Sequence, residues 1–315
     1  MKGLTDIPGI RVGHVSDFDA ITGCTAILCE PGAVAGVDIR GSASGTEEIE
    51  TLDPGHVTEQ IHGILLAGGS AFGLEAASGV RRYLEHKGIG FDTGAAKVPI
   101  VPAAILYDLG IGKAGVRPTL SMGEAAAAAA TDGPVAEGSV GAGTGATIGK
   151  ILGMKQAMKS GIGCSTVELT GGVLVAALVA VNAFGDVRDP ATGKIVSGAR
   201  RAPGSMDFAG TEEEMKRRPA TGFGGRNTTL AVVATNARLS KVQARKLAQF
   251  ASLGMARTIY PVNTTFDGDT VFALSLGSRA ADLNTLGVAA AESLSAAILR
   301  AVRLSKTLGG VPGLA

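Results

Sequence analysis

The chain has 315 residues, enough for one large domain or two average ones with a substantial buried core. Its 29 basic and 28 acidic residues give a formal net charge of +1, and aromatic residues make up only 4%, so we expect no nucleic-acid or membrane partner. No run of 18 apolar residues occurs, the first residues lack the hydrophobic segment of a signal peptide, and the three cysteines have no zinc spacing. These features predict a compact, glycine-rich, cytoplasmic α/β protein.

The N-terminal part of the chain is rich in predicted strands. Three short strands are expected over residues 10–15, 25–29 and 33–38, separated by glycine and proline. A buried strand is expected over residues 61–67, followed by a helix from about Leu74 to Glu85 that ends near Gly88.

The central part alternates between loops and apolar runs. A loop with a short strand over residues 99–107 precedes a helix built on Glu124 and the alanines at 125–130. A glycine-dense loop follows from Gly133 to Gly149, and the apolar run from Leu169 to Ala183 predicts a buried strand or a strand pair. The polar stretch from Asp186 to Arg226 predicts a solvated linker, which is the right setting for a loop that must be cut.

The C-terminal part predicts strand, helix, strand and helix in succession. The first strand begins at Thr228, and Ser240 is a suitable N-cap for a helix that runs to about Ala256. Residues 271–276 predict the second strand, and Leu283–Leu304 predicts a long, alanine-rich helix. Because the early strands are joined by connections too short for crossovers, the sheet cannot be purely parallel, and we expect helices covering stacked sheets.

The junction between Asn227 and Thr228 is the strongest candidate for chemistry. It follows a glycine-rich, charged loop and leads into the β-branched residues of the predicted strand. A threonine hydroxyl is a weak nucleophile without an adjacent base. If the bond between the two residues is cut, Thr228 gains a free α-amine with a reference pKa of about 7.7, and one residue then supplies nucleophile and base together. This pattern suggests a self-cleaving N-terminal-nucleophile hydrolase; the alternative is an ordinary junction between a loop and a strand.

A second Asn-Thr-Thr sequence occurs at residues 263–265. It leads into the acidic segment Asp267-Gly268-Asp269 and not into a β-branched strand, so we rank it below the first as a cleavage site. The two carboxylates lie two residues apart, and on an extended chain they would point to one face. Such a pair could ligate a metal, cap a turn, or orient Thr228.

Several other side chains could serve such a site. Asn182, near the end of the long apolar run, could donate to a developing oxyanion or simply bond the backbone. Lys150 and Glu137 flank the glycine-dense loop and are either catalytic or merely solvated. Gly143 and Thr144 belong to a glycine motif that could bring backbone amides close to a substrate, or form a tight turn.

Other enzyme classes fit the motifs poorly. The glycine motif is similar to a nucleotide-binding loop, but Thr144 occupies a glycine position of the Walker A pattern and Ile151 a serine or threonine position. Ser70 does not lie in a G-x-S-x-G sequence, and the four histidines have no metal-ligand spacing. A nucleotide-binding protein, a Ser-His-Asp hydrolase and a zinc enzyme are therefore disfavoured.

In their order along the chain, several segments resemble the autoprocessing aminopeptidase/D-esterase family. This family includes the β-peptidyl aminopeptidases and the nylon-oligomer (6-aminohexanoate oligomer) endo-hydrolases, and the resemblance spans nearly the whole chain. The segments that carry it are residues 7–14, 66–74, 137–145, 182–183, 227–229 and 267–270.

The resemblance implies a fold and an assembly. The fold would be a four-layer αββα sandwich of N-terminal-nucleophile type with mixed sheets, formed by a single hydrolase domain over residues 1–315. This domain would cut itself into fragments 1–227 and 228–315, which stay associated. The cleaved protomers would form a homo-oligomer, often a tetramer, and would act on a small amide or peptide substrate with no metal and no organic cofactor.

The resemblance also implies roles for individual residues. Thr228 would be the nucleophile, with its new amine as general base, and Lys150 would sit beside it. Asn182 would help to hold the oxyanion. Asp267 and Asp269 would orient Thr228 and stabilise its ammonium.

Two features point to different branches of this family. The aminopeptidases mostly use serine as nucleophile and a tyrosine at the position of Lys150, so Thr228 with Lys150 is more similar to the nylon-oligomer branch. Glu137, in contrast, matches the position where the aminopeptidases hold the free amine of the substrate, and would bind substrate together with Gly143 and Thr144. Two alternatives remain: an acyltransferase of the ornithine acetyltransferase type, and a non-catalytic binding or assembly protein of the same fold.

Overall fold

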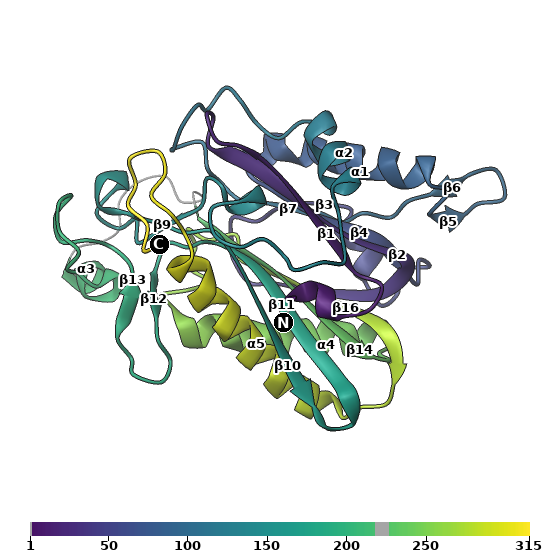
Figure 1. Ribbon diagram of the computed structural model, residues 1–315. Helices are drawn as coiled ribbons and strands as arrows, with labels where there is room; N and C mark the ends of the chain where they lie inside the picture. The colour runs from purple at the N-terminus through teal and green to yellow at the C-terminus, as the bar shows by residue number, and fades with distance from the viewer. Residues whose placement is uncertain (1, 218–226) are drawn as a thin grey trace.

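The centre of the molecule is a bent, nine-stranded mixed sheet, seen in a computed structural model that describes residues 2–217 and 227–315 (Figure 1). Its strands follow one another in the order β10, β11, β14, β16, β2, β4, β7 and β3, and β1 pairs with β2 outside this path. The pairs β14–β16 and β4–β7 are parallel, and the other pairs are antiparallel. The sequence-based expectation of a sheet that is not purely parallel is confirmed.

The elements have the following bounds. The strands of the large sheet are β1 (Arg11–Asp17), β2 (Thr22–Ile39), β3 (Gly45–Glu47), β4 (Ile61–Ala67), β7 (Ala103–Ile105), β10 (Ile162–Leu169), β11 (Val173–Asn182), β14 (Thr228–Ala237) and β16 (Thr270–Arg279). Short strands form smaller sheets, namely β5 (Phe91–Asp92), β6 (Lys97–Val98), β8 (Thr147–Ile148), β9 (Met158–Lys159), β12 (Asp186–Arg188), β13 (Ile195–Ser197) and β15 (Ile259–Tyr260). The helices are α1 (Glu75–His86), α2 (Leu120–Ala128), α3 (Thr211–Arg217), α4 (Lys241–Thr258) and α5 (Leu283–Arg303).

Strand β2 joins two halves of the sheet that pack against each other. Its first half pairs with β1 and β4, and its second half pairs with β16. Apolar residues of β2 and β4 meet those of β11, β14 and β16 in one buried cluster, so the two halves are stacked face to face. Helices α1 and α2 cover the outer face of one half, and α4 and α5 cover the other. These four layers form the αββα sandwich that the family resemblance implies, with helices covering stacked sheets as expected from the sequence.

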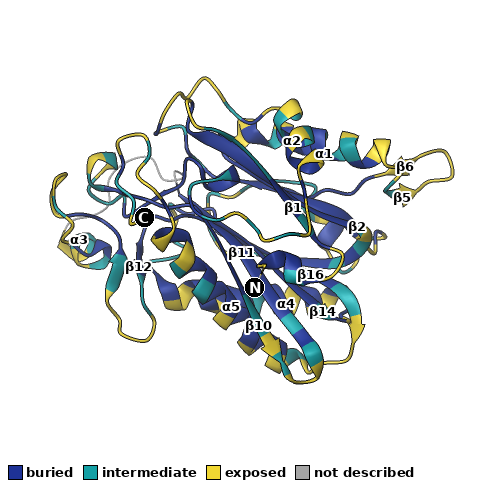
Figure 2. Cartoon of the chain, in the orientation of Figure 1, coloured by how far each residue is buried: buried dark blue, intermediate teal, exposed yellow. Residues whose placement is uncertain are grey.

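The pattern of side chains along β14 shows why the strand lies in the middle. Leu230 and Val232 point to the stacked sheet, whereas Ala231 and Val233 point to helices α4 and α5. Successive side chains of a strand point to opposite faces, so a strand buried on both faces has no polar face. Figure 2 shows the central strands as buried and the exposed residues on the outer faces of the helices.

Helix α5 owes its apolar composition to its place in the core. By length and composition it could cross a membrane, but 67% of its most apolar window is buried within the protein. It packs on β10 and β11, and the hydroxyl of Ser293 donates to the carbonyl of Ser165 at 2.9 Å. The helix is therefore part of the sandwich.

Two sequence-based expectations about the elements are wrong. The separate strands expected over 25–29 and 33–38 are parts of one strand, β2. Pro31 and Gly32 interrupt its pairing with β4, where the register shifts between Leu28 and Ala33, but the chain stays extended. Gly32 takes a φ of +90°, which permits this irregularity without ending the strand.

The stretch after residue 186 is likewise structured and not a solvated linker. It holds β12, β13 and α3 around the buried carboxylate of Asp186, which accepts hydrogen bonds from the amides of Ala199 and Thr211 at 2.9 and 2.6 Å. The hydroxyl of Thr211 adds a third at 2.7 Å. The sequence does not show whether an acid in a polar stretch is buried or exposed to solvent, and this is why a solvated linker was expected here. Residues 218–226 of the expected cleavage loop lie outside the described residues.

Candidate active site

Three segments meet at Thr228, the first residue of β14. The N-terminal ends of β14 and β16 lie at the same edge because these strands are parallel, and antiparallel β11 ends there. Asn182 is therefore the direct partner of Thr228 across the sheet, and the segment Asp267–Asp269 lies on the other side. Both Asn182 and Thr228 are buried.

The peptide bond before Thr228 is held between two donors. The hydroxyl of Thr228 donates to the carbonyl oxygen of Asn227 at 2.5 Å, and the backbone amide of Gly268 donates to the same oxygen at 2.9 Å. The side-chain amide of Asn227 donates to the carbonyl of Phe266 at 3.2 Å, and this bond holds Asn227 itself in place. The Thr228 hydroxyl therefore lies beside the carbonyl of Asn227, and a backbone amide already donates to the oxygen of that carbonyl.

Gly268 is required by the close approach of its neighbours. A Cβ atom at this position would lie 2.8 Å from the hydroxyl oxygen of Thr228 and 2.6 Å from the carbonyl oxygen of Ala43. Any side chain would therefore displace the Thr228 hydroxyl or the backbone opposite.

The side chain of Asn182 is oriented by its partners. Its Oδ1 accepts hydrogen bonds from the amide of Thr147 at 3.0 Å and from the Lys150 ammonium at 2.8 Å. Because both partners are donors, Oδ1 faces them and Nδ2 points the other way, where it donates to the carbonyl of Tyr107 at 3.0 Å. This orientation leaves Asn182 as a donor on the side away from Lys150, as an oxyanion role demands.

Lys150 contacts the site by binding Asn182. Its Nζ lies 2.8 Å from Oδ1 and 3.1 Å from the carbonyl oxygen of Asn182. Burial lowers the pKa of Lys150 to about 7, although Asp267, Asp108 and Asp269 oppose this shift by favouring the charged form. Lys150 can therefore carry or release a proton near neutral pH.

The two carboxylates of the site bind backbone amides around Thr228. Asp269 accepts from the amides of Thr229 at 2.6 Å and Asn263 at 3.0 Å. Asp267 accepts from the amide of Phe184 at 3.2 Å. Asp269 therefore holds the backbone directly after Thr228, whereas Asp267 holds the segment that follows β11, and the Thr228 hydroxyl itself donates to Asn227.

Burial also changes how these acids ionise. It raises the pKa of Asp269 to about 7, and the nearby charge of Asp267 adds to the effect. Burial raises the pKa of Asp267 as well, while hydrogen bonds from Thr264 oppose the change. A new ammonium at Thr228 would oppose both shifts by favouring the charged form of the carboxylates.

Thr264 is a residue of this site that the sequence did not assign. Its hydroxyl donates to Oδ2 of Asp267 at 2.5 Å and its amide donates to the same oxygen at 3.1 Å. A signal was present, because the second Asn-Thr-Thr sequence stands directly before the acidic segment. The amides of Gly268 and Thr147 were also missed, because every residue except proline has a backbone amide and the residue type does not show which amide donates to the site.

A second buried pair supports the loop beside the site. Asp108 accepts from the hydroxyl of Thr22 and the amide of Gly69, both at 2.7 Å, and burial raises its pKa. Lys159 is fully buried, and burial lowers its pKa to about 7 while Asp108 favours its charged form. Neither residue was singled out from the sequence.

The structure does not bring Glu137 to Thr228. Its carboxylate accepts from the amide of Cys164 at 2.8 Å and from Nε of Arg300 at 2.8 Å. Cys164 aligns across the strands with Val232, four residues along β14 and two strands away, which is roughly 16 Å from Thr228 at ordinary strand spacing. In the single chain Glu137 is the ion-pair partner of Arg300, and its expected hold on a substrate amine finds no support.

Gly143 and Thr144 are also turned inward. The hydroxyl of Thr144 donates to the carbonyl of Gly141 at 2.7 Å, its oxygen lies 3.0 Å from Oγ of Ser16, and the side chain is fully buried. The carbonyl of Gly143 binds Lys159 at 3.1 Å. A Cβ atom at Gly143 would lie 2.6 Å from the backbone of residues 161–162, so this glycine serves close packing. The geometry favours the tight turn over an open substrate cradle.

Metal ligands do not gather at this site. In residues 2–217 and 227–315 no group of three or more His, Cys, Asp or Glu side chains is placed to hold a metal ion. The groups that converge on Thr228 are instead a lysine, an asparagine, two acids and backbone amides.

Solved structures of the same fold come from aminopeptidases. A Burkholderia sp. beta-aminopeptidase shares 26% sequence identity, with a TM-score of 0.70 over 100% of this chain and 91% of the other. The L-aminopeptidase D-Ala-esterase/amidase of Ochrobactrum anthropi, described as a variant of the Ntn hydrolase fold, has a TM-score of 0.74 at 21% identity over 99% of this chain and 88% of the other. The chain therefore shares the fold of these Ntn-hydrolase-type aminopeptidases.

The sequence comparisons give the family. The model of peptidase family S58 matches residues 2–314. An uncharacterized aminopeptidase of Mycobacterium tuberculosis is 40% identical over 99% of this chain and 96% of its own length. A 6-aminohexanoate-oligomer endohydrolase of Kocuria sp. is 32% identical over 95% of this chain and 85% of its own length. The chain belongs to peptidase family S58, and it is a hydrolase of peptide or amide bonds.

Proposed function

We propose that the chain cuts itself between Asn227 and Thr228, and that the mature enzyme hydrolyses amides through a Thr228 acyl-enzyme. The observation that carries the proposal is the arrangement at the bond itself. The Thr228 hydroxyl and the Gly268 amide both bind the Asn227 carbonyl oxygen, at 2.5 and 2.9 Å. A nucleophile next to a carbonyl with a fixed oxyanion donor is the arrangement from which an N-to-O acyl shift starts.

Self-cleavage would proceed in two steps. Oγ of Thr228 attacks the carbonyl carbon of Asn227, Gly268 donates to the oxyanion, and the hydroxyl proton passes to neutral Lys150. The C–N bond then breaks and the leaving amine takes up a proton, which leaves an ester between Asn227 and Thr228. Water hydrolyses this ester to a carboxylate on Asn227 and restores the hydroxyl of Thr228, which now has a free amine.

Hydrolysis of substrate would use the new chain end. The free amine of Thr228 accepts the proton of its own hydroxyl, and Oγ attacks the substrate carbonyl carbon. Asn182 donates from Nδ2 to the oxyanion, while Lys150 holds its Oδ1. The departing amine takes the proton, and water then attacks the acyl-enzyme ester, releases the acid and regenerates Thr228. Asp267 and Asp269 lie where they can balance the Thr228 ammonium whenever it is charged.

The substrate we propose is a small linear amide or peptide. The mycobacterial relatives named as aminopeptidases share more identity with this chain than those named as 6-aminohexanoate-oligomer endohydrolases, 38–40% against 32–33%. Glu137, the residue that favoured a clamp on a free amine, accepts from Arg300 at 2.8 Å in the single chain. Both substrate classes therefore belong in the assay.

The test combines a chain analysis with a substrate panel. Purified protein is analysed by denaturing electrophoresis, and the smaller fragment is sequenced from its N-terminus; residues 228–315 make a fragment of 88 residues. Aminoacyl amides and 6-aminohexanoate oligomers are then supplied to the cut protein and to uncut Thr228→Ala. The proposal fails if wild-type protein hydrolyses either class while its chain stays whole. An amine acceptor that raises turnover would point to acyl transfer instead.

A further inference from the structure

The side chain of the fully buried Lys159 binds backbone carbonyls of the glycine-dense loop from Gly133 to Gly149, beside the active site. Its ammonium donates to the carbonyls of Ser160 at 2.6 Å, Ala146 at 2.8 Å and Gly143 at 3.1 Å. An ammonium has three donors, and here each finds one backbone acceptor. A buried lysine of this kind costs desolvation free energy, so its presence calls for an explanation in what the loop does.

The peptide unit between Ala146 and Thr147 connects Lys159 to Asn182. Its oxygen accepts from Lys159 at 2.8 Å, and its N–H, which points the opposite way, donates to Oδ1 of Asn182 at 3.0 Å. A cation at the oxygen polarises a peptide and strengthens its N–H as a donor. Lys159 therefore acts on Asn182 through a single rigid, planar group.

We infer that Lys159 is a positioning residue for the Thr228 site, acting through the Ala146–Thr147 peptide to fix the direction of the Asn182 carboxamide. This inference rests on the proposed function, because it assigns Asn182 the oxyanion donor of that reaction. Two donors hold Oδ1, the Thr147 amide and Lys150, so Nδ2 stays turned to the opposite side, where it donates to the carbonyl of Tyr107 at 3.0 Å. Loss of Lys159 removes one of the two donors that the described residues offer to the Ala146 oxygen, leaving the amide of Ser160 at 3.0 Å, and the peptide is held less firmly.

The other end of the loop is held independently of Lys159. Oγ of Ser16 accepts from the amide of Gly141 at 2.8 Å, and the hydroxyl of Thr25 accepts from the amide of Ala142 at 3.0 Å. A substitution at Lys159 should therefore loosen the end that leads to Asn182 without releasing the whole loop.

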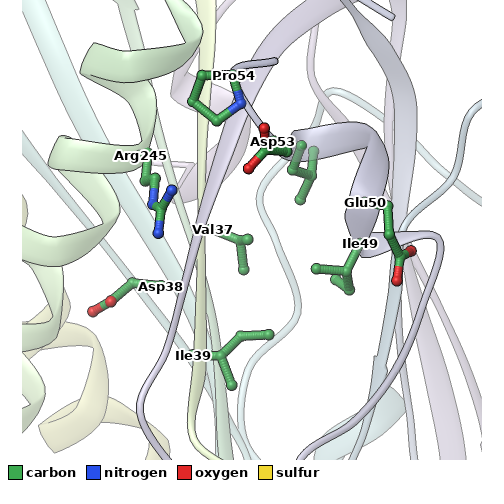
Figure 3. Close-up of a pocket in the computed structure, with 9 residues that line it drawn as sticks. Val37, Asp38, Ile39, Ile49, Glu50, Asp53, Pro54 and Arg245 are labelled. Atoms are coloured by element: carbon green, nitrogen blue, oxygen red, sulfur yellow. The ribbon is translucent and has the colours of Figure 1, made fainter. Parts of the chain in front are cut away.

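Lys241 offers a matched control in another part of the molecule. It is also buried, and its ammonium donates to the carbonyls of Thr51 and Thr58, both at 2.9 Å, and of His56 at 3.4 Å. The loop that it fastens includes Asp53 and Pro54, which line a surface cavity of about 490 Å³ beside α4 (Figure 3). The three carbonyls that Lys241 binds belong to residues 51–58, so the same kind of bond can be removed away from the Thr228 site.

The experiment is a double-mutant cycle between Lys159 and Asn182. Lys159→Met keeps the apolar stem and removes the three donors. We expect about 10- to 100-fold lower kcat on an amide substrate, with KM changed by less than about twofold, because the donor is misdirected and binding is not lost. In the Asn182→Ala background the same substitution should change kcat by less than about twofold, since there is no carboxamide left to orient. Lys241→Met should leave kcat unchanged.

Two results would overturn the inference. One is a kcat for Lys159→Met equal to that of the wild type. The other is an equal loss in both backgrounds, which is the mark of a merely structural role. If Lys159→Met does not accumulate as folded protein, Lys159→Gln, which retains one amide donor on a shorter stem, takes its place in the same cycle. Failure of the proposed function shows itself separately, as a wild-type chain that is active uncut or an Asn182→Ala variant with full activity.

Discussion

The two Asn-Thr-Thr sequences of this chain have the same residues and opposite roles. In the first, the Thr228 hydroxyl donates to the preceding carbonyl of Asn227 at 2.5 Å, at the start of a buried strand. In the second, the Thr264 hydroxyl donates at 2.5 Å to the carboxylate of Asp267, in a turn outside any strand. One hydroxyl faces a peptide carbon that it can attack, and the other is occupied by an acid.

This difference indicates that the neighbouring strand, and not the residues of the motif, determines which hydroxyl lies beside a peptide carbonyl. Parallel pairing brings the start of β16 beside the start of β14, so that the Gly268 amide reaches the Asn227 carbonyl at 2.9 Å. The second motif supports the first, because Thr264 and Asn263 hold the two carboxylates that lie next to Thr228. Cleavage is therefore expected after Asn227 and not after Asn263.

The largest effect should come from Thr228→Ala. Without the hydroxyl there is no nucleophile for either step, so we expect an uncut chain of 315 residues and no hydrolysis above background. Electrophoresis and a substrate assay measure both. Thr228→Ser keeps a hydroxyl and serves as the control, with cleavage retained. Cutting of the Thr228→Ala chain between residues 227 and 228 would exclude this residue as the agent of cleavage.

Asn182→Ala tests the donor on the other side of Thr228. Loss of one preorganised oxyanion donor typically lowers kcat by about 10²- to 10³-fold, with little effect on KM. Steady-state kinetics on protein that has completed cleavage gives the value. A change of less than about threefold in kcat would show that the oxyanion is held elsewhere.

Gly268→Ala acts on the geometry of the cleavage step. The added Cβ would lie 2.8 Å from the Thr228 hydroxyl oxygen, so the nucleophile must move, and we expect self-cleavage to slow by about 10- to 100-fold. The fraction cut over time after purification or refolding measures it. Gly115→Ala is the matched control, since a Cβ there meets nothing within 4 Å, and it should cut at the wild-type rate.

The pH dependence of self-cleavage tests Lys150. Burial lowers its pKa to about 7, so the neutral, proton-accepting form grows as pH rises toward 7 and dominates above it. We expect the cleavage rate to rise by about tenfold per pH unit below 7 and to level off above. Asp269 also has a pKa raised to about 7, so Lys150→Met separates the two groups: its slower cleavage should lose this rise. An identical pH profile in Lys150→Met would assign the rise to another group.

The smallest effect is expected from Thr264→Val in the second motif. The hydroxyl lowers the pKa of Asp267 by donating to it, so its loss raises that pKa and leaves less carboxylate charged near neutral pH. Cleavage after Asn227 should persist, slowed by up to about tenfold at pH 6.5 and by less at pH 8.5. A chain left completely uncut at both pH values would mean that Thr264 has a part in the cleavage chemistry itself.

The sequence predicted the parts of the fold that follow periodicity and local rules. Strand β14, the long helix α5 and the N-cap of α4 were all foreseen, and Ser240 caps α4 with a full capping box. The continuity of β2 through Pro31 was missed because the adjacent proline and glycine suggested a break between two strands. The packing around Asp186 was missed because a buried acid and a solvated one look the same in a sequence.

The candidate site was predictable only in its side chains. Thr228, Asn182, Lys150 and the acidic segment were named from residue type and order, and the structure brings them together. The contributions of Gly268 and Thr147 come from backbone amides placed by long-range pairing, which residue types do not encode. The substrate-binding role of Glu137 stays a prediction, and only the fold shows that Arg300 of α5 lies beside it.

The central claim is that one bond, between Asn227 and Thr228, is cut by the residue that follows it. Intact-mass analysis of freshly purified wild-type protein, followed by N-terminal sequencing, tests it most directly. We predict two associated fragments of 227 and 88 residues, the smaller beginning Thr228-Thr229-Leu230. A fully active preparation in which all 315 residues remain in one chain would contradict the account.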